Sequence, residues 1–161
     1  MSFDISRALV CLEEAKHLYS RLAIVVGPSG AGKSALLAEM ANRLSGKVVN
    51  VNLELSKRML ELTSRQRTLE LARLLSEAAS VDNSAPAFLD NIEMLFAPVF
   101  AQDPIRLLKS VARDCTVVVA WNGGVRDGFL TYAAPSHPEY YRTPVEDIVV
   151  VTQGSASFHG K

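Results

Sequence analysis

One segment of the sequence has residue types and spacing suited to phosphate chemistry. Residues 27–34, Gly-Pro-Ser-Gly-Ala-Gly-Lys-Ser, match the pattern G-x-x-x-x-G-K-[ST] at every fixed position. Glycines let backbone N–H groups turn toward an anion, and a following helix presents its positive N-terminal end to the same phosphates. The pattern therefore predicts a nucleotide site, with Lys33 on the β- and γ-phosphates and the Ser34 hydroxyl on Mg²⁺. The residues expected around the nucleotide are Gly27, Pro28, Ser29, Gly30, Ala31, Gly32, Lys33, Ser34 and Ala35.

Two polar residues at the ends of apolar runs are candidates to complete this site. A phosphate loop needs a carboxylate on a neighbouring strand to organise magnesium, and Asp90 ends the run 87–90. The alternative role for Asp90 is a cap for a helix over 92–96. Asn122 directly follows the run 117–121 and is the candidate sensor of the γ-phosphate. The alternative for Asn122 is a plain turn with the two glycines that follow it.

The order of these segments resembles the additional-strand class of P-loop ATPases, which includes the AAA+ and RecA-like families. A strand–helix unit over 48–79 separates the loop from Asp90, which implies an inserted strand between the loop strand and the Asp90 strand. Many members of the class carry glutamate directly after the strand-end aspartate, where it polarises the attacking water, but Asn91 holds that place here. Glu54, just past the second strand, is the candidate base, and Glu93 is the alternative. A protein with very slow turnover, or one that needs a partner, is the third possibility.

Two further roles in hydrolysis have candidates. An arginine that stabilises charge developing on the γ-phosphate often comes from a neighbouring subunit. Arg142 precedes the last strand and is the candidate; Arg126 and Arg113 are alternatives, and plain solvent exposure is the simpler interpretation of all three. Asn50 or Asn52 can hydrogen-bond to the catalytic carboxylate, as a strand-end asparagine does in AAA+ proteins, or can simply pack on the second strand.

The elements that must position these residues follow from the apolar pattern. The chain has 161 residues, 48% of them hydrophobic, and we expect a single P-loop NTPase domain over 1–161. Strand-sized apolar runs lie at 22–26, 48–53, 87–90, 116–121 and 148–151, and helical patterns lie at 5–15, 34–44, 71–78 and from 104 onward. We expect an α/β three-layer sandwich with a mainly parallel five-stranded sheet in AAA+-like order.

One interval breaks this alternation. Asp127-Gly128 indicates a β-hairpin within 117–133, and a loop is expected around Pro135, Pro138 and Pro144. We expect no helical lid after the last strand.

Charge and cysteine content narrow the function classes. Seventeen basic and 17 acidic residues give a net charge of zero, which excludes a uniformly basic nucleic-acid-binding protein. The charge is nevertheless segregated, +4 over residues 43–73 and −5 over 74–103. These segments suit self-assembly into a homo-oligomer, a charged partner, or DNA contact through 43–73; solvated helix faces are the simpler interpretation. Two cysteines exclude a disulfide scaffold, and the acidic residues near the start and the short apolar runs predict a cytoplasmic protein with no membrane contact.

Several segments together resemble one family, BrxF, the small P-loop proteins of type 3 BREX bacteriophage-defence systems. The likeness covers residues 5–151, and its segments besides the phosphate loop are VNLELSKR (51–58), LDNIE (89–93), VAWNG (119–123), LTYA (130–133) and HPEY (137–140). The resemblance implies a role in phage defence beside a BREX methyltransferase, a large ATPase and an alkaline-phosphatase-like protein.

Three functions are compatible with these observations. We expect an ATP- and Mg²⁺-dependent ATPase that is weak alone and is activated by assembly or by partners. A nucleotide-gated binding module that contacts a partner or DNA with little turnover is the alternative. A nucleotide kinase is the third, because the loop also looks like that of guanylate kinase, although no arginine-rich lid or acceptor motif follows it.

Overall fold

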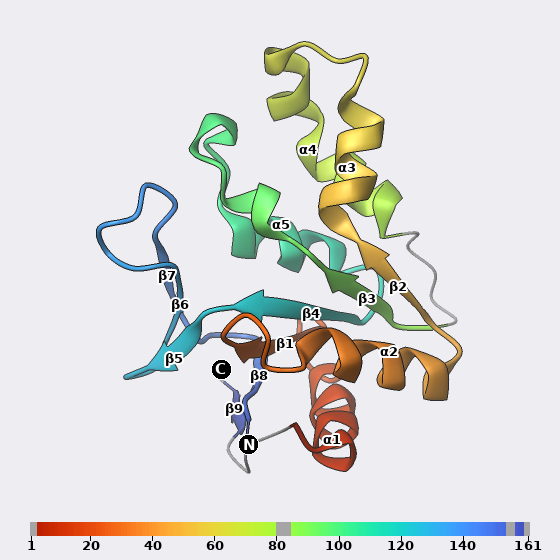
Figure 1. Cartoon of the computed structure of the whole chain (residues 1–161). Helices are drawn as coiled ribbons and strands as arrows, with labels where there is room; N and C mark the ends of the chain where they lie inside the picture. The colour runs from red at the N-terminus through yellow and green to blue at the C-terminus, as the bar shows by residue number, and fades with distance from the viewer. Residues whose placement is uncertain (1–2, 80–84, 154–156, 160–161) are drawn as a thin grey trace.

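A six-stranded sheet with helices on both sides forms the centre of the computed structural model, which describes residues 3–79, 85–153 and 157–159 (Figure 1). The helices are α1 (Ile5–Ala15), α2 (Lys33–Leu44), α3 (Val51–Met59), α4 (Ser64–Ala78) and α5 (Pro104–Val111), with 3-10 turns η1 (Glu93–Phe96) and η2 (Pro98–Phe100). The strands of this sheet are β1 (Leu22–Gly27), β2 (Lys47–Asn50), β3 (Ala87–Asp90), β4 (Val117–Asn122), β8 (Val149–Val151) and β9 (Ser157–His159). A separate three-stranded sheet contains β5 (Gly124–Arg126), β6 (Phe129–Tyr132) and β7 (Tyr141–Pro144).

The strand order of the main sheet is β2-β3-β4-β1-β8-β9. The first five strands are parallel, and β9 pairs antiparallel with β8. Strand β4 lies between the loop strand β1 and the Asp90 strand β3, so the inserted strand predicted from the sequence is present. This is the order of the additional-strand P-loop NTPases, and the predicted fold class is confirmed. The sixth strand, β9, was not predicted.

Alternate residues of β1 pack against two different helical layers. Leu22, Ile24 and Val26 belong to a buried cluster with α3, α4 and α5. Ala23 and Val25 belong to a second cluster with α1 and α2. Every residue of β1 is buried, as expected of a central parallel strand covered on both faces. The two helical layers and the sheet form the predicted three-layer sandwich.

Capping side chains begin two helices where the sequence predicts them. Asp4 Oδ1 accepts a hydrogen bond of 3.0 Å from the backbone N–H of Ser6 at the start of α1. Asp103 Oδ1 accepts one of 3.1 Å from Ile105, and Pro104 is the first residue of α5. Among the described residues, no helix is long and apolar enough to cross a membrane.

The prediction of a second strand over 48–53 is wrong at its C-terminal end. Strand β2 stops at Asn50, whose Oδ1 accepts a hydrogen bond of 3.1 Å from Leu53 N and caps α3. Val51 and Leu55 then face the core at helical spacing and are fully buried. The run V-V-N-V-N-L alternates like a strand, but the asparagine cap and the burial of the following turns favour the helix.

The smaller sheet confirms one prediction and corrects another. Strands β5 and β6 form a hairpin whose two-residue turn is Asp127-Gly128, with φ of 53° and 79°. The hairpin begins at 124, because residues 117–122 belong to the main sheet. The expected loop around Pro144 is instead strand β7, which pairs with β6. Proline is tolerated there because β7 is an edge strand of its sheet.

Gly123 joins the two sheets at a point with no room for a side chain. Its N–H donates to Gly27 O at 3.1 Å, and Trp121 Nε1 donates to Thr131 O at 3.0 Å. A Cβ atom at Gly123 would lie 1.9 Å from Thr131 O, whereas a Cβ at Gly124 meets no atom within 4 Å. The end of β4, the phosphate loop and β6 are therefore held together at this glycine.

We expect Gly123→Ala to lower the free energy of unfolding by on the order of 3 kcal/mol, because backbone must move to accept the methyl group. Gly124→Ala is the matched control and is expected to change stability by less than about 1 kcal/mol. Chemical denaturation followed by circular dichroism measures both. Equal midpoints for the two variants would contradict the described contact between Gly123 and Thr131.

Candidate nucleotide-binding site

The phosphate loop connects β1 to α2 in a backbone conformation that two glycines make possible. Gly30 and Gly32 have φ of 81° and 95°, in the left-handed region that glycine adopts without strain. A Cβ at either position meets no atom within 4 Å, so the backbone angle and not space requires glycine. Gly32 is the N-cap of α2, and the 12-residue helix directs its N-terminal end toward the loop.

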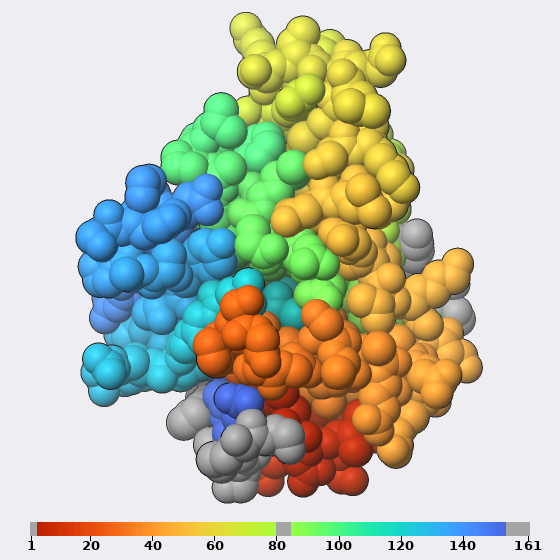
Figure 2. Space-filling view, in the orientation of Figure 1, coloured from red at the N-terminus to blue at the C-terminus, as the bar shows by residue number. Residues whose placement is uncertain are grey.

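The loop forms one wall of a cavity of about 350 Å³ at the carboxyl ends of the parallel strands. The residues that line it are Ser29, Gly30, Gly32, Lys33, Ser34, Asp90, Asn91, Glu93, Ala120 and Asn122. In Figure 2 the loop segment (orange) lies at the front face beside the β4–β5 segment (cyan), with the segment after β3 (green) above it. The other predicted loop residues, Gly27, Pro28, Ala31 and Ala35, lie outside this lining.

Lys33 carries a positive charge at the edge of the cavity. The side chain is only 6% exposed, and its Nζ donates to Gly27 O at 2.9 Å and to Pro28 O at 2.6 Å. Burial lowers the pKa of the Lys33 amine, and the carboxylates of Asp90 and Glu93 oppose this effect. The amine is therefore held by two neutral carbonyls and faces two carboxylates, in a place where a phosphate can replace the carbonyl contacts.

Ser34 and Asp90 both line the cavity and contact each other. Ser34 Oγ donates to Asp90 Oδ2 at 2.6 Å, which joins the first turn of α2 to the end of β3. A hydroxyl beside a carboxylate is the donor set with which P-loop proteins hold Mg²⁺, so these residues fit that ion. The alternative role of Asp90 as a helix cap is not observed, because Ile92 precedes η1 and no side chain caps it. Within the described residues, no group of three or more His, Cys, Asp or Glu forms a separate metal site.

Glu93 reaches the cavity through the turn that follows β3. Asn91 adopts φ of 54°, Ile92 is buried, and Glu93 begins η1 and lines the cavity. Asn52, at the start of α3, holds this turn: its Oδ1 accepts from Met94 N at 2.9 Å, and its Nδ2 donates to Glu93 Oε1 at 3.4 Å. From the sequence alone, Asn50 and Asn52 are equal candidates to contact a catalytic carboxylate; in the fold Asn50 instead caps α3.

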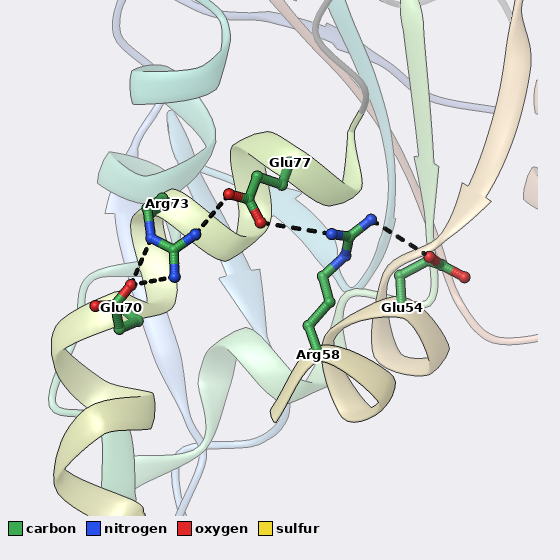
Figure 3. A network of polar contacts seen from close by, with 5 residues as sticks. All are labelled: Glu54, Arg58, Glu70, Arg73 and Glu77. Atoms are coloured by element: carbon green, nitrogen blue, oxygen red, sulfur yellow. Dashed lines mark hydrogen bonds and ion pairs between the residues drawn. The ribbon is translucent and has the colours of Figure 1, made fainter. Parts of the chain in front are cut away.

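Glu54 lies away from the cavity lining. Because α3 begins at Val51, Glu54 is in the first helical turn and not at a strand end. Its carboxylate pairs with Lys57 at 3.5 Å and with Arg58 at 3.8 Å. Arg58 also pairs with Glu77 on α4, which pairs with Arg73 (Figure 3). The side chain thus belongs to an ion-pair network between α3 and α4, and Glu93 is the carboxylate that the fold places beside Lys33 and Asp90.

Asn122 and Arg142 differ in placement. Asn122 ends β4 directly opposite Gly27 and lines the cavity, as expected of a residue near the γ-phosphate. Arg142 lies on β7, exposed, with its guanidinium carbon 3.5 Å from the ring centroid of Phe129. It does not line the cavity of its own chain, and its action on a neighbouring subunit stays a prediction.

Comparison with known proteins adds little to this geometry. No family model and no curated protein matches the sequence. One solved structure similar to the chain is that of C. elegans PCH-2, with 16% sequence identity and a TM-score of 0.44. The match covers 93% of this chain and 41% of the PCH-2 chain. Strand order and loop conformation, and not this likeness, define the chain as having a P-loop NTPase fold.

Proposed function

We propose that this chain binds ATP with Mg²⁺ in the cavity beside the phosphate loop and hydrolyses it. The observation that carries the proposal is the hydrogen bond of 2.6 Å between Ser34 and Asp90 next to the buried amine of Lys33. In an open cavity of about 350 Å³, this combination presents a positive charge and a hydroxyl–carboxylate pair to one ligand. A triphosphate with its magnesium ion matches that arrangement of charge.

Each residue in the cavity has a role that its position supports. Lys33 would hold the β- and γ-phosphates, and Ser34 and Asp90 would hold Mg²⁺, which neutralises charge on the phosphates. Asn122 would contact the γ-phosphate from the end of β4. Glu93 would accept the proton of the attacking water, and its hydrogen bond to Asn52 supports this choice over Glu54. Asn52 is a positioning residue, because it contacts the base and not the substrate.

Self-assembly and phage defence belong to the proposal as its biological setting. The resemblance to the BrxF family supports a role in BREX defence together with other BREX proteins. An arginine near the γ-phosphate often stabilises the transition state in P-loop NTPases, and none lines the described cavity. A second copy of the chain or a partner would supply it, with Arg142 the candidate for the former.

A nucleotide-gated binding module is the second candidate function. It is favoured by Asn91, which lines the cavity where a catalytic glutamate is common in related ATPases and which cannot accept a proton. In this function Lys33, Ser34 and Asp90 bind the nucleotide as before, but turnover is negligible. The nucleotide then controls contacts with another molecule.

Turnover measured against protein concentration separates the two functions. We expect phosphate release per chain to rise with concentration, because assembly supplies the missing arginine, and to stop when EDTA removes Mg²⁺. Flat and negligible release, with ATP-dependent complex formation in sedimentation, would favour the binding module. Phosphate release that persists in EDTA would contradict the assignment of Ser34 and Asp90.

A further inference from the structure

The outer face of the smaller sheet carries two arginines outside the nucleotide cavity. The register places Gly124, Thr131 and Arg142 in one cross-strand row, and Arg126, Phe129 and Pro144 in the next row on the same face. The opposite face holds Val125, Leu130 and Tyr132, which pack on the core. Because side chains alternate along a strand, the arginine rows face away from the core.

Both arginines adjoin the same aromatic ring. Arg142 lies over Phe129 with its guanidinium carbon 3.5 Å from the ring centroid, and Arg126 is directly opposite Phe129 in the pairing of β5 with β6. In the described part of the chain, neither arginine forms an ion pair within 4.0 Å. Two positive side chains in adjacent rows of one face, with no carboxylate bound to either among the described residues, form a place where an anion is favoured.

The arginines of the smaller sheet differ from most basic residues of the segment 43–73, which form ion pairs. Four of the seven basic residues of that segment, Arg43, Lys57, Arg58 and Arg73, form ion pairs with glutamates of α2, α3 and α4. Glu77 supplies one of these partners from the acidic segment 74–103, and Figure 3 shows it between Arg58 and Arg73. These four basic residues are therefore partly neutralised by neighbouring glutamates, most of them outside the acidic segment. Among the described residues, the arginines of the smaller sheet have no such partner.

A groove of about 490 Å³ extends from these arginines across the sheet. Its lining includes Arg126, Thr131 and Arg142. Pro135 and Tyr140 line it from the connection between β6 and β7, and Asp127 at the hairpin turn supplies its one carboxylate. The lining is unobstructed at Gly124, where a Cβ would meet no atom within 4 Å.

From this arrangement we propose that the outer face of β5, β6 and β7 binds single-stranded nucleic acid. Arg126 and Arg142 contact phosphates, and a base stacks on the half-buried ring of Tyr140. A tyrosine ring in the same groove as two guanidinium groups favours a nucleic acid over an acidic peptide, whose side chains offer no ring to stack. The site lies outside the nucleotide cavity of its own chain, so it can be tested without ATP, when Arg142 has no γ-phosphate of a neighbouring subunit to contact.

Fluorescence anisotropy of a labelled oligothymidylate, with no ATP present, tests this site. We expect binding by the full chain that weakens between about 50 and 200 mM salt. Arg126→Gln should weaken binding by about tenfold and lower the salt dependence by about one phosphate contact. Tyr140→Leu should weaken it by about fivefold or more through lost stacking. The matched control is Arg65→Gln, at an exposed position of α4 in the 43–73 segment, which should bind like the unchanged chain.

The outcomes that overturn the proposal are distinct. Absence of binding at the lower salt concentration overturns it directly. A loss in Arg65→Gln equal to that in Arg126→Gln would place the contact on the 43–73 segment instead. Equal competition by polyglutamate would show a site for acidic peptides, and equal competition by thymidine monophosphate would show a site for single nucleotides. Thermal unfolding midpoints of the variants verify that each remains folded, and Arg126→Lys should restore most of the binding if charge is responsible.

Discussion

Replacement of Lys33 by alanine is expected to weaken ATP binding by at least about tenfold to a hundredfold. The amine is the one buried positive charge that lines the described cavity, and it faces two carboxylates in addition to the loop. Without it, the phosphates would meet Asp90 and Glu93 with no opposing side-chain charge. Hydrogen bonds to charged groups are worth about 1.5–3 kcal/mol, so we expect affinity to fall by at least about tenfold to a hundredfold. Displacement of a fluorescent ATP analogue measures the change.

The matched control for this substitution is Lys47→Ala, which removes an exposed lysine at the start of β2. It should bind the analogue like the unchanged chain. Lys33→Ala is expected to remain folded, because its amine contacts only two loop carbonyls. Unchanged affinity in a folded Lys33→Ala protein would remove the basis for the site.

Glu93→Gln is expected to arrest hydrolysis and leave ATP binding intact. The amide keeps the size of the side chain but cannot accept a proton from water. Loss of a general base lowers rate by about 10²–10⁴-fold. Removal of a carboxylate near the phosphates also reduces repulsion, so affinity for ATP should be equal or higher. Single-turnover phosphate release and nucleotide binding, measured on one preparation, separate the two effects.

Glu54→Gln is the informative companion, because the sequence favoured Glu54 as the base. Its carboxylate pairs with Lys57 and Arg58 on the α3–α4 side. The pairs are exposed, and such pairs contribute about 0–1 kcal/mol, so we expect normal turnover and a small change in stability. A variant Glu54→Gln that loses turnover while Glu93→Gln retains it would reverse the proposed assignment.

Much of the fold could be predicted because local and long-range signals agree. The sequences of β1, β3, β4 and β8 are continuous apolar runs, as expected of strands buried on both faces, and these strands are almost wholly buried in the fold. The side chains of Asp4 and Asp103 are suited to cap helices, and they do so at the starts of α1 and α5. The prediction of a strand over 48–53 was wrong at its C-terminal end because the apolar–polar alternation there fits both a strand and the first turn of a capped helix. Strand β7 was not predicted because three nearby prolines favour a loop, whereas an edge strand can accommodate Pro144.

Some residues of the candidate site could be predicted from the sequence, and others could not. Lys33, Ser34, Asp90 and Asn122 could be brought together from sequence because each follows a recognisable strand, and parallel strands end at one edge of the sheet. The sequence favoured Glu54 over Glu93 because 48–53 was taken as a strand that places Glu54 at its end. In the fold α3 begins at Val51, and the turn at Asn91 brings Glu93, not Glu54, to the cavity. The signal in the sequence for this placement was the capping preference of Asn50, which moves Glu54 into a helix.

Charge could be counted but not placed from the sequence. Residues 43–73 and 74–103 have opposite net charge, which suggested complementary surfaces. In the fold, Arg58 and Arg73 of the first segment both pair with Glu77 of the second. Arg73 and Glu77 lie four residues apart on α4, whereas Arg58 reaches Glu77 only because α3 packs against α4. No linear count of charge contains that second contact.

Isothermal titration of the folded chain with a non-hydrolysable ATP analogue tests the central claim most directly. The account predicts saturable binding of one nucleotide per chain in the presence of Mg²⁺, and markedly weaker binding when EDTA is added. The absence of saturable binding at millimolar nucleotide, from a chain shown to be folded by circular dichroism, would contradict it.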